Sequence, residues 1–111
     1  WPSITLPALR RWLKHKGVYA VKMDCEGCEY VVADDVLQED PEFFFNIQQL
    51  AIEVHSGSYW AETEEHAYGL GRLFQLLEDS GLRLADAQIS GYTAAKEQVG
   101  CPKLFTKTGY P

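Results

Sequence analysis

The 111-residue sequence has little positive charge and no long hydrophobic run. Ten Lys and Arg residues stand against sixteen Asp and Glu residues, which gives a net charge of −6. Because nucleic-acid affinity rests mainly on phosphate neutralisation by Lys and Arg, this balance argues against a nucleic-acid binder. No apolar stretch approaches the roughly 18 residues that suggest a membrane span. We therefore expect a soluble protein with no nucleic-acid partner and no membrane span.

Targeting signals and a disulfide framework are also missing from the sequence. No signal peptide is visible, and the first residue is Trp1 rather than Met, so we expect a processed, excised or partial product of unknown compartment. Cysteine occurs only at Cys25, Cys28 and Cys101. This low, odd number argues against a disulfide framework.

Strands and helices alternate along the predicted chain. Apolar periodicity and composition indicate helices at about 6–16, 29–37 and 63–80, buried strands at 18–24 and 50–55, and final strands at 82–89 and 104–108. Thr5 and Thr63 are the expected N-caps, and Gly17 and Gly81 the expected stops. Such alternation predicts an α/β fold with a mostly parallel sheet of about four strands and helices on its faces. The last two strands lack an intervening helix, so we expect them to be antiparallel neighbours.

The most informative stretch, 21–29, reads VKMDCEGCE. It combines the end of a predicted strand, a glycine that permits a sharp turn, and acids at a helix start. It resembles the strand-and-turn motif of FkbM-type methyltransferases, which reads Lys, apolar, Asp, any, Glu, Gly, small, Glu, and every fixed position matches. The stretch at 50–55, LAIEVH, is similar to the family's next strand, which ends in an acid often followed by His. The resemblance covers nearly all of the chain.

The resemblance implies a partial Rossmann-like methyltransferase fold and a site at the ends of two strands. Ligands of open α/β sheets bind beyond the carboxyl ends of the strands, where Asp24 and Glu53 are predicted to converge. We therefore assign catalytic roles to Asp24, Glu53 and His55, with His55 able to take a proton from an acceptor hydroxyl. Asp24, Glu26 and Gly27 are the predicted cofactor-binding residues.

Three further residues are predicted to contact the substrate: Glu29, Tyr59 and Trp60. Structural alternatives stay open for several of these assignments. Glu26 and Glu29 either join the site or only stabilise the start of a helix. Tyr59 and Trp60 either line an acceptor pocket or fold over the core, and a histidine after a strand is more often structural than catalytic.

The largest departure from the family is the missing cofactor turn. The resemblance implies an S-adenosylmethionine site built by the first half of the domain, with a glycine-rich turn after the first strand. The only GxG here, at 69–71, lies inside a predicted helix, where we interpret its glycines as close-packing points. We therefore expect residues 1–111 to be the single C-terminal half of a methyltransferase-like domain, without the cofactor-binding N-terminal half.

Two functions follow from this departure. The first is part of an O-methyltransferase acting on a sugar or small-molecule hydroxyl, inactive as this fragment alone and binding S-adenosylmethionine only if the missing half is supplied. The alternative is a non-catalytic, methyltransferase-derived interaction or structural subunit of a larger assembly. In both cases the Val18–Met23 strand would have a bare edge, which favours pairing with another chain. We expect the remainder of the domain or another protein chain to cover it.

The pair Cys25 and Cys28 allows a third interpretation. A CxxC at a strand-to-helix turn resembles a thioredoxin-like redox site. A zinc site would need four ligands, with Cys101 and either His55 or His66 as candidates. Both cysteines of the pair occupy positions that the family motif leaves free or fills with small residues, so we predict no metal site.

Overall fold

The computed structural model describes residues 2–55, 63–87 and 101–107, and within the last range the side chains of Phe105 and Thr106. The elements follow in the order α1 (Leu6–Trp12), β1 (Val18–Met23), η1 (Cys28–Tyr30), α2 (Val32–Glu39), η2 (Phe43–Asn46), β2 (Ile47–Val54), α3 (Glu64–Asp79), β3 (Leu82–Ala87) and β4 (Cys101–Lys107). Strands and helices therefore alternate up to β3, as predicted.

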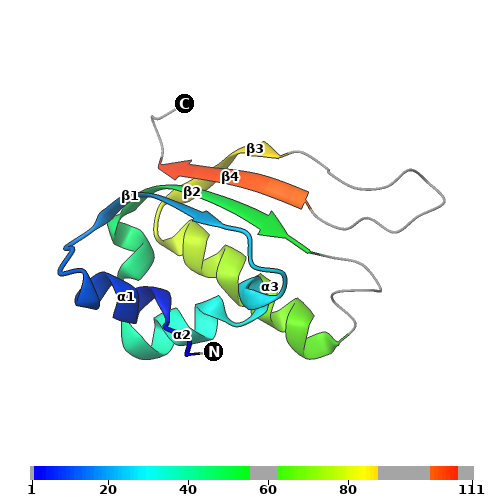
Figure 1. The fold of residues 1–111 in the computed structure, drawn as a ribbon. Helices are drawn as coiled ribbons and strands as arrows, with labels where there is room; N and C mark the ends of the chain where they lie inside the picture. Colours follow the sequence, from blue (N-terminus) through cyan, green and yellow to red (C-terminus); the bar gives the residue numbers. More distant parts are fainter. Residues whose placement is uncertain (1, 56–62, 88–100, 108–111) are drawn as a thin grey trace.

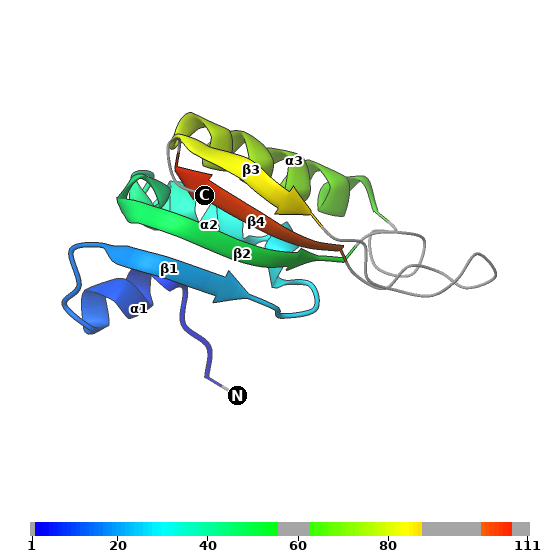
Figure 2. The same cartoon turned by 90° about the horizontal axis from the view of Figure 1, so that it is seen from above.

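The four strands form one mixed sheet in the order β1-β2-β4-β3 (Figures 1 and 2). β1 pairs parallel with β2, whereas β4 pairs antiparallel with both β2 and β3. The α/β class and the antiparallel final strands are confirmed. The mostly parallel sheet is not, because β4 inserts between β2 and β3 and leaves a single parallel pairing.

Helices α1, α2 and α3 lie on one face of the sheet (Figures 1 and 2). The expectation of helices on the faces of the sheet is therefore met on one face only in the described part of the chain. In β2, Leu50, Ile52 and Val54 are buried, while the alternating Gln49 and Glu53 are partly exposed. This period of two is typical of a sheet with one solvated face, so β2 is not the fully buried strand that its composition predicted.

The hydrophobic core fills the space between the sheet and the helices. Leu50 and Ile52 of β2 pack there with Leu73 and Leu77 of α3, and each has an exposed fraction of 2% or less. Burying one such side chain contributes roughly 1.5–3 kcal/mol. The apolar periodicity that predicted this helix is thus confirmed at Leu73 and Leu77. Every helix in the described ranges is too short or too polar to cross a lipid bilayer.

Side chains cap two helices where the sequence predicted them. The Thr5 hydroxyl accepts a hydrogen bond from the Ala8 N–H at 3.2 Å, and the Thr63 hydroxyl accepts one from the His66 N–H at 3.1 Å. Each bond satisfies a backbone donor that the first helical turn leaves without an intrahelical partner. These local signals place the starts of α1 and α3.

Helix ends were predicted less well. Gly81 follows the cap of α3 with a φ of +88°, as expected of a glycine stop. Helix α1, however, ends at Trp12, several residues before Gly17. Lys14 takes the left-handed conformation there, with a φ of +59°. The predicted helix to residue 16 was therefore too long.

Of the two glycines in the GxG, only one is a close-packing point. A Cβ atom at Gly69 would clash with the backbone carbonyl of Tyr30, so α3 approaches η1 closely at this position. A Cβ at Gly71 would meet no heavy atom within 4 Å. The packing interpretation is confirmed for Gly69 and wrong for Gly71.

Strand β1 lies at one edge of the sheet, and it is largely exposed. Met23 is buried, whereas Tyr19, Ala20 and Lys22 are exposed, and Tyr19 is 62% exposed. The predicted buried strand is therefore an edge strand in this structure. Within the described ranges no strand pairs with its outer side, and a covering partner stays a prediction.

Candidate functional site

The ends of β1 and β2 bring three of the predicted residues together. Parallel register pairs Met23 with Ile52, so Asp24 emerges beside Glu53 and His55. One ligand atom from each of Asp24, Glu53 and His55 lies within 4.8 Å of the others. The Nε2 atom of His55 is 3.9 Å from Oε1 of Glu53. The predicted convergence is confirmed, while the catalytic roles stay a prediction.

His55 is buried and held from several sides. Its Nδ1 lies 2.9 Å from Oε1 of Glu29, and its backbone N–H donates to the same oxygen at 3.0 Å. The Tyr30 hydroxyl donates to the His55 carbonyl oxygen. Burial raises the pKa of the Tyr30 phenol, and the negative charge of Glu29 raises this pKa further. The phenol therefore keeps its proton and stays a donor to His55.

The ends of β1 and β2, where Asp24, Glu53 and His55 converge, are called the rim below. Glu29 lies inside the molecule rather than at this rim. Its exposed fraction is 0%, and Oε2 accepts a hydrogen bond from the Gly27 N–H at 2.9 Å. Together with the two bonds to His55, this carboxylate ties the turn after β1 to the end of β2. The predicted substrate contact does not fit this place, because both oxygens already accept hydrogen bonds within the protein. In the structure Glu29 positions His55.

Sequence reasoning missed this positioning role. The two residues are 26 positions apart, and only the parallel pairing of β1 with β2 brings them into contact. An acid next to a helix start is ordinarily explained by the helix dipole. The sequence held one signal for this role: Glu29 follows the turn glycine Gly27, and His55 stands at the end of the next predicted strand.

The turn between β1 and η1 has a strained backbone. Glu26 and Gly27 both have positive φ angles, +42° and +118°. The sharp turn predicted at Gly27 is confirmed, and Glu26 is an exposed non-glycine residue in the left-handed region, which is uncommon. Their cofactor-binding roles stay a prediction.

A disulfide between Cys25 and Cys28 spans this turn, with a Cα–Cα distance of 5.6 Å. The low, odd number of cysteines gave no indication of it. The pair allows the redox interpretation, since Cys25 is exposed. For the zinc alternative, the Cys101 side chain lies outside the described residues, and His66 stacks on Tyr30 with ring centroids 4.4 Å apart.

Residues in the described ranges line cavities beside the sheet. One, of about 340 Å³, is lined by Asp24 at the rim together with Lys22, Cys25 and Asp35, among others. The exposed carboxylate of Asp24 therefore opens into a recess beside β1. The predicted substrate residues Tyr59 and Trp60 lie outside the described ranges.

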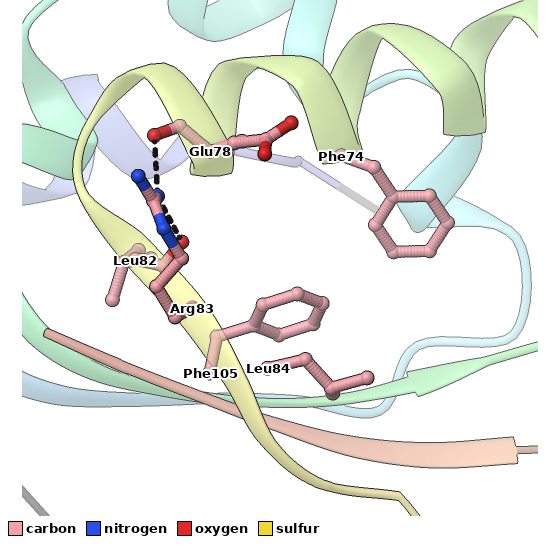
Figure 3. Close-up of a pocket in the computed structure, with 6 residues that line it drawn as sticks. All are labelled: Phe74, Glu78, Leu82, Arg83, Leu84 and Phe105. Carbon is pink, nitrogen blue, oxygen red and sulfur yellow. Dashed lines mark hydrogen bonds between the residues drawn. The ribbon is translucent and has the colours of Figure 1, made fainter. Parts of the chain in front are cut away.

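The second cavity, of about 310 Å³, lies between α3 and the β3–β4 pair (Figure 3). Phe74, Leu84 and Phe105 form its apolar lining. Arg83 donates to the backbone carbonyl oxygens of Glu78 and Leu82, at 2.8 and 3.0 Å. Its charged group is thus engaged in holding α3 to β3, and the rim at Asp24 is the better candidate site.

Comparisons with known proteins returned nothing: no family model, no curated protein and no solved structure matches the chain. The resemblance to FkbM-type methyltransferases therefore stays a prediction that rests on the motif at 21–29 and the stretch at 50–55.

Proposed function

We propose that this chain is the C-terminal half of an FkbM-like, S-adenosylmethionine-dependent O-methyltransferase domain that acts on a sugar or small-molecule hydroxyl. One observation carries the proposal: Asp24, Glu53 and His55 converge within 4.8 Å where two parallel strands end. This is where open α/β sheets bind their ligands. The resemblance of the 21–29 motif supplies the reaction class.

The chemistry assigned to this chain is proton removal from the acceptor hydroxyl. Glu29 accepts the Nδ1–H of His55, which leaves the lone pair of the neutral ring on Nε2. Nε2 lies on the side of Glu53 and takes the hydroxyl proton as general base. Glu53 and Asp24 then stabilise the imidazolium that forms and orient the acceptor.

The described residues do not provide a complete site for the methyl donor. The GxG lies within α3, whereas a dinucleotide-type turn stands between a strand and a helix start. Donor binding therefore needs the remainder of the domain, and this chain contributes the acceptor chemistry.

The exposed edge of β1 favours a second candidate function. Tyr19 is 62% exposed on an outermost strand, and such edges pair readily with other chains. A methyltransferase-derived subunit that docks through this edge, without catalysis, is the alternative proposal.

Titration of the full-length gene product with S-adenosylmethionine separates these two functions. Saturable binding supports the enzyme, and absence of binding with recovery of the protein in a complex supports the subunit. If the donor binds, transfer of its radiolabelled methyl group to a panel of hydroxylated acceptors follows. His55→Gln should lower transfer about 10²–10⁴-fold, the usual contribution of a general base, while donor binding persists. The exposed His15 provides a matched control in His15→Gln, which should transfer normally.

A further inference from the structure

The rim at Asp24 has the donor atoms of a metal site as well as those of a general base. Asp24 and Glu53 each offer a carboxylate oxygen, and His55 offers an imidazole nitrogen, all within 4.8 Å of one another. Bonds of about 2.0–2.2 Å to one ion place such ligand atoms roughly 3–3.5 Å apart. The 3.9 Å between His55 Nε2 and Glu53 Oε1 is close to that spacing.

Rotation of the Asp24 and Glu53 side chains would bring the ligand atoms from within 4.8 Å of one another to the spacing that one ion needs. Asp24 is exposed and the Glu53 side chain is 27% exposed, so both carboxylates have room to rotate. His55, whose side chain is 3% exposed, is the fixed member. A site with one rigid ligand and two adjustable ones needs only a small contraction to coordinate an ion.

A buried partner orients His55 as it would in a metal site. Histidine ligands almost always donate their second ring N–H to a carboxylate, carbonyl or water, which fixes the tautomer and raises ligand basicity. Glu29 accepts from Nδ1 at 2.9 Å, and its other oxygen is held by Gly27. Nε2, the ring nitrogen on the side of Glu53, is thereby the coordinating atom.

The donor set selects the class of ion. Two carboxylates with one imidazole suit Mn²⁺, Fe²⁺ or Zn²⁺, whereas Mg²⁺ and Ca²⁺ prefer oxygen ligands alone. A second potential ligand group in the described part of the chain, Cys25, Cys28 and Glu29, is engaged, because the two sulfurs are joined and the carboxylate holds His55. The disulfide leaves no thiolate of Cys25 or Cys28 for an ion. The proposed ligands are therefore the oxygen and nitrogen atoms of Asp24, Glu53 and His55.

We propose that Asp24, Glu53 and His55 bind a divalent first-row transition-metal ion, with Glu29 as the positioning residue for His55. Three protein ligands leave coordination positions open for water or an oxygen-donor ligand. The Asp24 side of the site is exposed and borders the cavity of about 340 Å³ beside β1, and Glu53 is partly exposed. The proposal does not rest on methyl transfer, since ion binding needs only these side chains. Because Nε2 has a single lone pair, His55 acts as a general base only while no ion is bound.

Titration with Mn²⁺ under non-reducing conditions, followed by loss of the free-ion electron paramagnetic resonance signal, tests the site. Mn²⁺ is chosen because thiolates favour Zn²⁺ and copper, which would also report on the cysteines. We expect one saturable ion per chain. Asp24→Asn should weaken this binding at least about tenfold, and Glu29→Gln about 10–100-fold, the usual effect of losing a partner that orients a ligand.

The matched control is Asp79→Asn, the same chemical change at an exposed residue at the end of α3, just before β3 begins. It should leave Mn²⁺ binding unchanged. Asp24 is exposed, so Asp24→Asn should keep the thermal unfolding transition of the parent protein, which separates ligand loss from unfolding. Absence of saturable binding, or binding that Asp24→Asn and Asp79→Asn affect equally, would overturn the proposal.

Discussion

Carboxylates form pairs of similar length in two regions of the molecule, but in opposite surroundings. In the interior, behind the rim, Glu29 Oε1 lies 2.9 Å from His55 Nδ1, and the exposed fractions of the two side chains are 0% and 3%. On the helical layer, Arg72 Nε and Asp34 Oδ1 are 2.8 Å apart, with side chains 41% and 47% exposed. Water screens the second pair and not the first, so burial, rather than distance, ranks their contributions.

A further pair on the helical layer illustrates the exposed case. Arg11 and Thr5 both donate to the carboxylate of Glu39, at 2.8 and 2.9 Å. Both hydrogen bonds lower the pKa of Glu39, and the bond from Arg11 has the larger effect. The charged form of Glu39 is thus favoured, but water also reaches this carboxylate and weakens its interactions. Water does not reach the Glu29 carboxylate, which is 0% exposed.

The largest expected effect comes from breaking the buried pair. Glu29→Gln replaces one acceptor oxygen by an amide that faces donor groups, which leaves a donor of Gly27 or His55 without its bond. Leaving a buried donor without its acceptor costs about 1–3 kcal/mol, and more where the lost acceptor carries a charge. Urea unfolding of the variant should show a decrease in the free energy of unfolding of that order. A decrease below about 1 kcal/mol would mean that this pair contributes no more to stability than an exposed pair does, and would contradict the account.

An intermediate effect is expected where Gly69 of α3 packs against Tyr30 of η1. Gly69→Ala places a Cβ against the carbonyl of Tyr30, the residue after Glu29, and should cost about 1–3 kcal/mol of stability through overpacking. Gly71→Ala is the matched control in the same helix, with no heavy atom within 4 Å of its new Cβ. It should stabilise the protein by up to about 1 kcal/mol, because alanine is the better helix former. Thermal unfolding of both variants measures the contrast; equal melting temperatures would contradict the close approach of α3 to η1.

The smallest effect belongs to the exposed pair. Arg72→Ala should lower the free energy of unfolding by only about 0.2–1 kcal/mol, and the difference should shrink further in 1 M salt. Denaturant unfolding at low and high salt gives both values. A loss that rivals that of Glu29→Gln and persists in salt would remove the distinction between the two regions.

The sequence predicted those features that depend on local pattern. Thr5 and Thr63 cap helices because a hydroxyl before an apolar, periodic segment meets the first free N–H groups. Asp24 and Glu53 converge because each ends a strand and parallel strands end at the same edge. Both inferences need only the neighbouring residues and a general rule of folds.

Features that depend on distant contacts were not predicted. Glu29 is buried with a partner 26 positions away. The insertion of β4 between β2 and β3 is a choice of topology that strand composition does not encode. The bare edge of β1 was predicted, but the exposure of its side chains was not, because it follows from the place of β1 in the strand order.

The account depends most directly on how the ring of His55 is oriented. Nitrogen-15 NMR of the imidazole groups near pH 8 distinguishes the two tautomers of each of the three histidines. We predict that one ring, assigned to His55 by its loss in His55→Gln, carries its proton on Nδ1, and that Glu29→Gln abolishes this preference. A His55 ring protonated on Nε2, or one that Glu29→Gln leaves unchanged, would contradict the positioning role of Glu29 and both functions proposed for the rim.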